Sequence, residues 1–131
     1  MLRRYLFAGI IIVASLAQGW AAAAQQLTAD ATYVWVNELG SKMTTSWGTD
    51  GLITGTYVSA VGCGAGTVRP LTGWWNNSAM TFTVNWQECN SLTSWTGNYN
   101  AGTTTTLWLL TVSGPPQWNS INAGTDIFTL Q

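Results

Sequence analysis

The chain has 131 residues, a formal net charge of −1, no histidine and only 7% charged residues. One domain accounts for this length, because domains usually run to about 100 to 150 residues. The lack of histidine removes the usual general base, the commonest metal ligand and every serine–histidine–aspartate triad. No phosphate-binding loop, dinucleotide fingerprint or nucleophile elbow is present either. The sequence therefore favours a non-catalytic protein without a metal or cofactor.

Residues 1–24 have the pattern of a secretory signal peptide. They begin with two arginines, continue with an apolar run over 6–16 and end in the small-residue cleavage pattern of three alanines at 22–24. A transmembrane anchor is the alternative, but a span needs about 20 apolar residues, and serine, glutamine and glycine interrupt this one. We expect a leader at 1–24 and a secreted or periplasmic domain at 25–131.

The expected domain carries two cations against five acids, which gives a net charge of −3. A negative domain of this kind favours neither nucleic acid nor an anionic membrane surface as a partner.

From Asp30 onward, short runs rich in Val, Thr, Tyr and Trp alternate with turn residues, and no helical period is sustained. Sequential hairpins favour an antiparallel meander, and closing the sheet removes its exposed edges. We predict an all-β fold, an eight-stranded antiparallel up-and-down β-barrel, which has room for one small ligand. The predicted strands are Thr32–Asn37, Lys42–Trp47, Leu52–Ser59, Arg69–Asn76, Met80–Trp86, Thr93–Asn100, Thr103–Val112 and Ile121–Leu130.

Side chains two apart on a strand share a face, so parity indicates which of them converge inside the barrel. Several predicted strand ends pair a hydrogen-bonding group with a large apolar one on the same face. This mixture is typical of a small-molecule pocket, but an ordinary β core with polar ends gives the same pattern. The sets that share a face are Trp35 and Asn37; Tyr57, Ser59 and Val61; Thr93 and Trp95; Trp108 and Leu110; Asp126 and Phe128.

Nine tryptophans are an unusual number for a chain of this length. Tryptophan buries a large rigid surface and keeps an N–H group that needs a partner. The tryptophans could wall a ligand cavity, or they could form an exposed platform that stacks sugar rings, as in a carbohydrate-binding module. Some must belong to the core, and Trp35 and Trp75 are the candidates.

Seven short motifs follow one another across residues 35–129. They are W-V-N-E-L-G-S at 35–41, L-I-T-G-T-Y-V-S-A-V-G at 52–62, L-T-G at 71–73, F-T-V-N-W at 82–86, S-L-T-S-W-T-G at 91–97, L-W-L-L-T at 107–111 and G-T-D-I-F-T at 124–129. In this order and spacing they resemble the avidin and streptavidin family. The resemblance implies a β-barrel that binds biotin with high affinity in its mouth and catalyses no reaction.

The resemblance also implies a role for each matching site residue. Three side chains would donate to the ureido oxygen of biotin, and two would accept from its ureido N–H groups. Another would face the ring sulfur, a serine with the backbone near a cysteine would meet the valerate carboxylate, and apolar residues would wall the pocket. The three donors are Asn37, Ser41 and Tyr57, and the two acceptors are Ser59 and Asp126. Thr93 would face the sulfur, and Ser91 with the backbone near Cys63 would meet the carboxylate. The wall residues are Trp86, Trp95 and Trp108, with Leu39, Val61 and Leu110 between them.

This set of polar groups has a physical logic of its own. Three donors on one carbonyl oxygen stabilise its charge-separated form, which makes the ring nitrogens better donors to Ser59 and Asp126. A rigid barrel that holds the groups in place before binding avoids much of the ordering cost.

The two cysteines, Cys63 and Cys89, resemble those of the short bacterial, rhizavidin-like avidins, in which a disulfide joins the loop after the third strand to the loop before the sixth. The resemblance implies the same bond here, and an oxidising compartment also favours a disulfide over two thiols. Such a bond would tether both rims of the pocket mouth, besides stabilising the fold by loop closure.

Trp118 lies six residues before Gly124, as in tetrameric avidins, where such a tryptophan reaches a neighbouring subunit; dimeric short avidins generally lack it. We expect Trp118 to cover a neighbour's pocket, with packing in its own rim as the alternative. Trp74 and Trp75 face opposite sides of a strand, and we expect Trp74 to point outward, which usually marks an interface. Together these features predict a homo-oligomer of two or more chains.

The alternative function is a secreted, tryptophan-rich β-module that binds a carbohydrate or another small heterocycle. It predicts a row of exposed tryptophans, whereas the biotin hypothesis predicts tryptophans buried around a cavity. An enzyme is least favoured, because Asp126 has no evident partner acid or base. A purely structural barrel would not need Asn37, Tyr57, Ser59 and Asp126 together.

Overall fold

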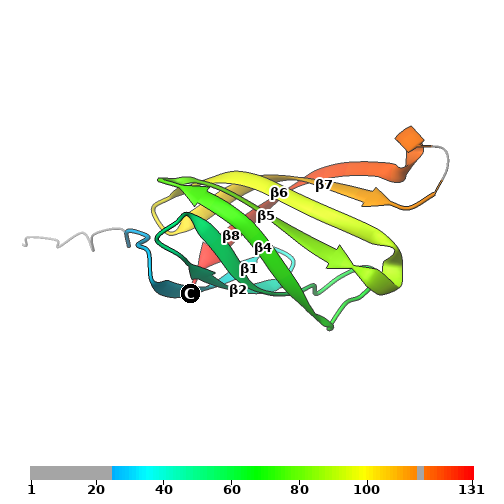
Figure 1. Ribbon diagram of the computed structural model, residues 1–131. Coiled ribbons are helices and arrows are strands. Elements are labelled where there is room, and N and C mark those ends of the chain that lie inside the picture. Colours follow the sequence, from blue (N-terminus) through cyan, green and yellow to red (C-terminus); the bar gives the residue numbers. More distant parts are fainter. Residues whose placement is uncertain (1–24, 115–116) are drawn as a thin grey trace, which may run out of the picture.

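The computed structural model describes residues 25–114 and 117–131, which form a closed β-barrel (Figure 1). Each strand pairs antiparallel with the next, and the last pairs with the first. The leader expected at 1–24 lies outside the described residues and stays a prediction. The strands are β1 (Ala31–Asn37), β2 (Lys42–Trp47), β3 (Leu52–Val58), β4 (Val68–Asn76), β5 (Ala79–Trp86), β6 (Ser91–Asn100), β7 (Thr103–Val112) and β8 (Ile121–Leu130).

The predicted eight-stranded up-and-down barrel is confirmed, and strand ends shift by two residues at most. Two short 3-10 helices, η1 (Gln87–Cys89) and η2 (Gln117–Ser120), were not expected, because a single turn is too short to show a periodic pattern. Among the described residues, no helix is long and apolar enough to cross a membrane.

Alternation along the strands puts the core inside the barrel. On β5 the side chains of Met80, Phe82, Val84 and Trp86 are buried, and those between them are exposed. This follows from the two-residue period of a strand, which sends successive side chains to opposite faces. The polar residues that share the inner parity are therefore carried into the barrel as well.

Aromatic side chains fill the end of the barrel near the β2–β3 turn. Trp35 is fully buried, as predicted, and its ring stacks on Trp47 with 6.5 Å between centroids. Trp75 is only partly buried; it packs against Trp47, and its Nε1 donates to the Gly48 carbonyl at 3.2 Å. The core prediction thus holds fully for Trp35 and in part for Trp75.

The buried Thr45 on β2 satisfies two indoles at once. Its Oγ1 accepts hydrogen bonds from Nε1 of Trp35 and from Nε1 of Trp47, each at 3.0 Å. Two large rings can therefore share a small interior without leaving a buried donor unsatisfied.

We expect Thr45→Val to lower the free energy of unfolding by about 2 to 6 kcal/mol, because it leaves two buried indole donors without a partner and each costs about 1 to 3 kcal/mol. Valine keeps the shape of threonine, so packing changes little. Guanidinium unfolding measures the effect, with Thr44→Val on the other face of β2 as the control. Equal stability of the two variants would contradict the role given to Thr45.

Candidate ligand-binding site

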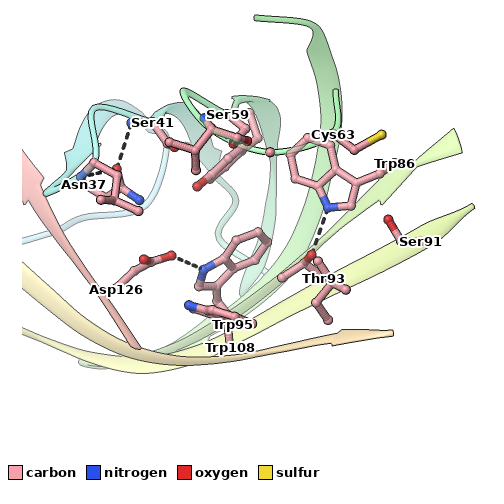
Figure 2. A pocket seen from close by; sticks show the side chains of 15 residues that line it. Asn37, Ser41, Ser59, Cys63, Trp86, Ser91, Thr93, Trp95, Trp108 and Asp126 are labelled. Atoms are coloured by element: carbon pink, nitrogen blue, oxygen red, sulfur yellow. Dashed lines mark hydrogen bonds between the residues drawn. The ribbon is translucent and has the colours of Figure 1, made fainter. Parts of the chain in front are cut away.

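A cavity of about 240 Å³ opens at the end of the barrel that carries the β1–β2, β3–β4 and β5–β6 loops. Asn37 and Asp126 lie at one end of it, and Trp86 and Ser91 lie at the other (Figure 2). It is lined by Asn37, Leu39, Ser41, Tyr57, Ser59, Val61, Gly62, Cys63, Trp86, Ser91, Thr93, Trp95, Trp108, Leu110 and Asp126.

Fourteen of the fifteen predicted site residues line this one cavity, and Gly62 is the one lining residue that was not predicted. Sequence reasoning had no signal for Gly62, because it has no side chain to assign a role. The role of each residue toward a ligand stays a prediction.

Two of the predicted donors are oriented by backbone N–H groups that bond to their side-chain oxygens. The Asn37 side-chain oxygen accepts from the backbone N–H groups of Leu39 at 3.1 Å and Ser41 at 2.8 Å (Figure 2). Its NH2 group has two hydrogens, of which one is donated to the Asp126 carboxylate and the other is left for a ligand. The Ser41 hydroxyl oxygen accepts from the backbone N–H of Ala60 at 3.0 Å, so its hydrogen is left to donate.

Tyr57 is the third predicted donor. Its ring stacks on Trp95, with 5.1 Å between centroids, and only 2% of the residue is exposed. Burial raises the pKa of Tyr57 well above its ordinary value of 10.0, although the Ser41 hydroxyl lowers it. The phenol therefore stays protonated at neutral pH and keeps a hydrogen to donate.

Ser59 is oriented as an acceptor. Its hydroxyl donates to the Val61 carbonyl at 2.7 Å, which uses its only hydrogen. A hydroxyl has one donor and two acceptor lone pairs, so what remains for a ligand is acceptor capacity.

Asp126 is the only carboxylic acid among the described residues that line the cavity. One of its oxygens accepts from Nε1 of Trp95 at 2.8 Å, and the Asn37 side chain also donates to the carboxylate. A carboxylate has about four acceptor positions, so acceptor capacity remains for a ligand. Burial raises the pKa of Asp126, and the hydrogen bonds from Trp95 and Asn37 oppose that rise.

The aromatic walls hold one another in place. Trp95 lies between Tyr57 and Phe82, whose ring centroids are 5.1 and 5.0 Å from its own. Trp86 forms a T-shaped pair with Tyr57 and donates from Nε1 to the Thr93 hydroxyl at 2.9 Å. The walls are therefore built before any ligand arrives.

Trp108 fits into the wall because its cross-strand partner on β8 is Gly124. A β-carbon at position 124 would overlap the indole ring of Trp108. Sequence reasoning missed this dependence, because it requires the register of β7 against β8.

The disulfide predicted between Cys63 and Cys89 is present, with 6.0 Å between the two Cα atoms. It joins the β3–β4 loop to η1, and an ion pair between Arg69 and Glu88 joins β4 to the same helix. The Arg69 guanidinium lowers the pKa of Glu88. Two rims of the cavity mouth are thus tied together by a covalent and an ionic link.

Trp118 is the predicted site residue that does not line the cavity. It lies on η2 and is 85% exposed, so packing within its own rim is wrong. The reason is the place of η2 at the tip of the β7–β8 hairpin, which extends beyond the rest of the barrel (Figure 1). Contact with a neighbour's pocket stays a prediction.

The described residues contain no group of three or more His, Cys, Asp or Glu side chains placed to hold a metal ion. The chemistry of the cavity is that of neutral hydrogen-bonding groups, aromatic rings and one carboxyl.

The Avidin family model matches residues 25–131. The chain belongs to the avidin family. Afifavidin from Afifella pfennigii is 41% identical over 106 residues, a match that covers 73% of this chain but only 66% of that relative. Among solved structures, apo shwanavidin is 33% identical with a TM-score of 0.75, covering 82% of this chain and 99% of its own. A rhizavidin–biotin complex is 30% identical with a TM-score of 0.72, covering 80% and 96%.

The buried carboxyl of this avidin-family barrel gives a pH prediction. Because the folded-state pKa of Asp126 is raised, its protonated form is favoured by folding; this contribution is full below the unfolded pKa of about 3.9 and is lost as pH rises through the folded value. We expect ligand-free Asp126→Asn to gain stability over wild type between pH 3 and pH 7. Guanidinium unfolding at both pH values measures the gain.

The matched control is Asp50→Asn, at the exposed β2–β3 turn. A stability difference between Asp126→Asn and wild type that is the same at both pH values would contradict the prediction.

Proposed function

We propose that this avidin-family chain binds biotin in the cavity of its barrel and acts by binding alone. The observation that carries the proposal is the set of hydrogen-bonding positions left free in the cavity. Asn37, Ser41 and Tyr57 present side-chain donors to the cavity, and Ser59 and Asp126 present acceptor positions that their bonds to Val61 and Trp95 do not use up.

A cyclic urea is the complement of that set. It has one carbonyl oxygen, which can take several donors, and two N–H groups, which need two acceptors. The ureido ring of biotin has this form, and the rhizavidin structure similar to this chain is a biotin complex. Ser91, Thr93 and the aromatic walls then remain for the sulfur ring and the acyl tail.

Prior fixation of these groups supports tight binding. Asn37 is held by two backbone bonds, Trp95 by Asp126, and Trp86 by Thr93. Groups that are already ordered lose little entropy when a ligand binds, and this is what makes a preorganised site strong.

Binding without catalysis fits the same residues. The sequence has no histidine, and the described cavity-lining residues include no second carboxyl and no lysine beside Asp126. A two-carboxylate or nucleophile–base arrangement would need such a partner.

A sugar platform has little support. Trp35, Trp47, Trp86 and Trp95 are buried inside the barrel. Trp74 and Trp118 are exposed, but they lie on different elements and do not form a row with the others.

Saturating biotin should raise the melting temperature strongly, because a ligand that binds only the folded state stabilises it by mass action. Asp126→Ala should weaken binding by about 1 to 3 kcal/mol, since one buried polar partner is lost. Thr129→Ala, on the outer face of the same strand, is the control. An unchanged melting curve in wild type, or wild-type affinity in Asp126→Ala, would contradict the proposal.

We also propose that the chain forms a homo-oligomer. Trp74 points outward, as expected, and is 57% exposed, but the larger apolar surface lies on the outer face of three adjacent strands, β6, β7 and β8. Exposed apolar patches of this kind usually mark contact surfaces, and a second copy presents the same surface. The exposed apolar residues on this outer face are Leu92, Leu107, Leu109, Ile121 and Ile127.

Light scattering at micromolar concentration should find at least a dimer. The double variant Leu107→Lys, Leu109→Lys should be a monomer, because two charges would be buried without partners. Trp74→Ala separates the two candidate surfaces, since it should leave the assembly intact if β6 to β8 form the contact. A monomeric wild type would overturn the proposal.

A further inference from the structure

The closure of the barrel has one short seam. β1 pairs with β8 only through Trp35, Val36 and Asn37, which lie opposite Leu130, Thr129 and Phe128. Each of the other seven neighbouring pairs runs through at least six residues on each strand. Toward the cavity mouth the backbone ladder therefore stops at Asn37 and Phe128.

Glu38 continues this ladder by one step with its side chain. In the register of β1 against β8, the residue opposite Glu38 is Ile127. No backbone pairing is formed there; instead the backbone N–H of Ile127 donates to Oε2 of Glu38 at 2.8 Å. The carboxylate takes the place of the missing backbone acceptor.

This bond fixes one end of a peptide group whose other end is also held. The Asp126 carbonyl, in the same peptide as the Ile127 N–H, accepts from the Thr106 hydroxyl at 2.9 Å. The peptide group between Asp126 and Ile127 is thus held by Thr106 of β7 on one side and by Glu38 on the other. Glu38 also directly follows Asn37, so it lies between two polar residues of the cavity.

We propose that Glu38 is a positioning residue, which holds Asn37 and Asp126 at their places across the β1–β8 seam without touching the ligand. The inference rests on the proposed function, since it concerns the same site. Its side chain is exposed and does not line the cavity, so it can affect binding either through the seam or through its charge, which raises the pKa of Asp126 and of Tyr57.

Two variants of Glu38 separate the effect of its hydrogen-bond acceptor from the effect of its negative charge. Glu38→Gln keeps an oxygen that accepts the Ile127 N–H and removes the charge, whereas Glu38→Ala removes both. Asp50→Ala is the matched control, because Asp50 also accepts a backbone N–H, that of Leu52 at 3.0 Å, but at the turn between β2 and β3, away from the cavity.

The readouts are the biotin dissociation rate, measured by displacement of labelled biotin, and hydrogen exchange of the Ile127 amide in the ligand-free protein. We expect Glu38→Ala to release biotin roughly three- to tenfold faster, which corresponds to the loss of one hydrogen bond, and to exchange the Ile127 amide faster. Glu38→Gln should stay within about twofold of wild type in both readouts, and Asp50→Ala should release biotin at the wild-type rate.

Two results would overturn the inference: wild-type release by Glu38→Ala, or equally fast release by Glu38→Gln and Glu38→Ala, which would assign the effect to charge. A wild-type chain that does not bind biotin would instead refute the proposed function. Hydrogen exchange of the Ile127 amide then tests the positioning role on its own. Unchanged exchange in Glu38→Ala would overturn that role.

Discussion

Buried indole N–H groups organise the inside of this barrel, because each of them needs an acceptor and few are available. At the filled end, Thr45 accepts from Trp35 and Trp47. At the open end, the acceptors for Trp86 and Trp95 are Thr93 and Asp126, which also line the cavity. The hydrogen bonds from Trp86 to Thr93 and from Trp95 to Asp126 therefore satisfy buried indoles and also orient residues of the site. The same bonds that stabilise the fold hold the pocket in shape.

The buried carboxyl of Asp126 lowers the stability of the fold. A carboxyl buried among aromatic rings is harder to ionise than one in water, and no basic side chain lines the cavity beside Asp126 to offset this. A barrel built only for stability would place a neutral side chain there. Retaining an acid at this position exchanges some stability for an acceptor of full negative charge, a trade that is common at functional sites.

Much of this arrangement could be predicted from the sequence, because a two-residue period is simple to follow along short strands. Parity placed Asn37 with Trp35 and Thr93 with Trp95 on one inner face, and the motif resemblance assigned the loop residues Leu39 and Cys63. Interactions that depend on the pairing of distant strands could not be predicted. The fit of Trp108 over Gly124 requires the β7–β8 register, and the bond from Ile127 to Glu38 requires the contact between the first and last strands. The position of Trp118 depended on how far the β7–β8 hairpin extends, which no local pattern shows (Figure 1).

We propose that the donors and acceptors of the cavity match the ureido ring of biotin. Calorimetric titration of the purified protein with biotin tests it most directly. We expect saturable, exothermic binding of one biotin per chain, because one cavity of this kind lies in the described barrel. Absence of binding at micromolar protein and excess biotin would contradict it.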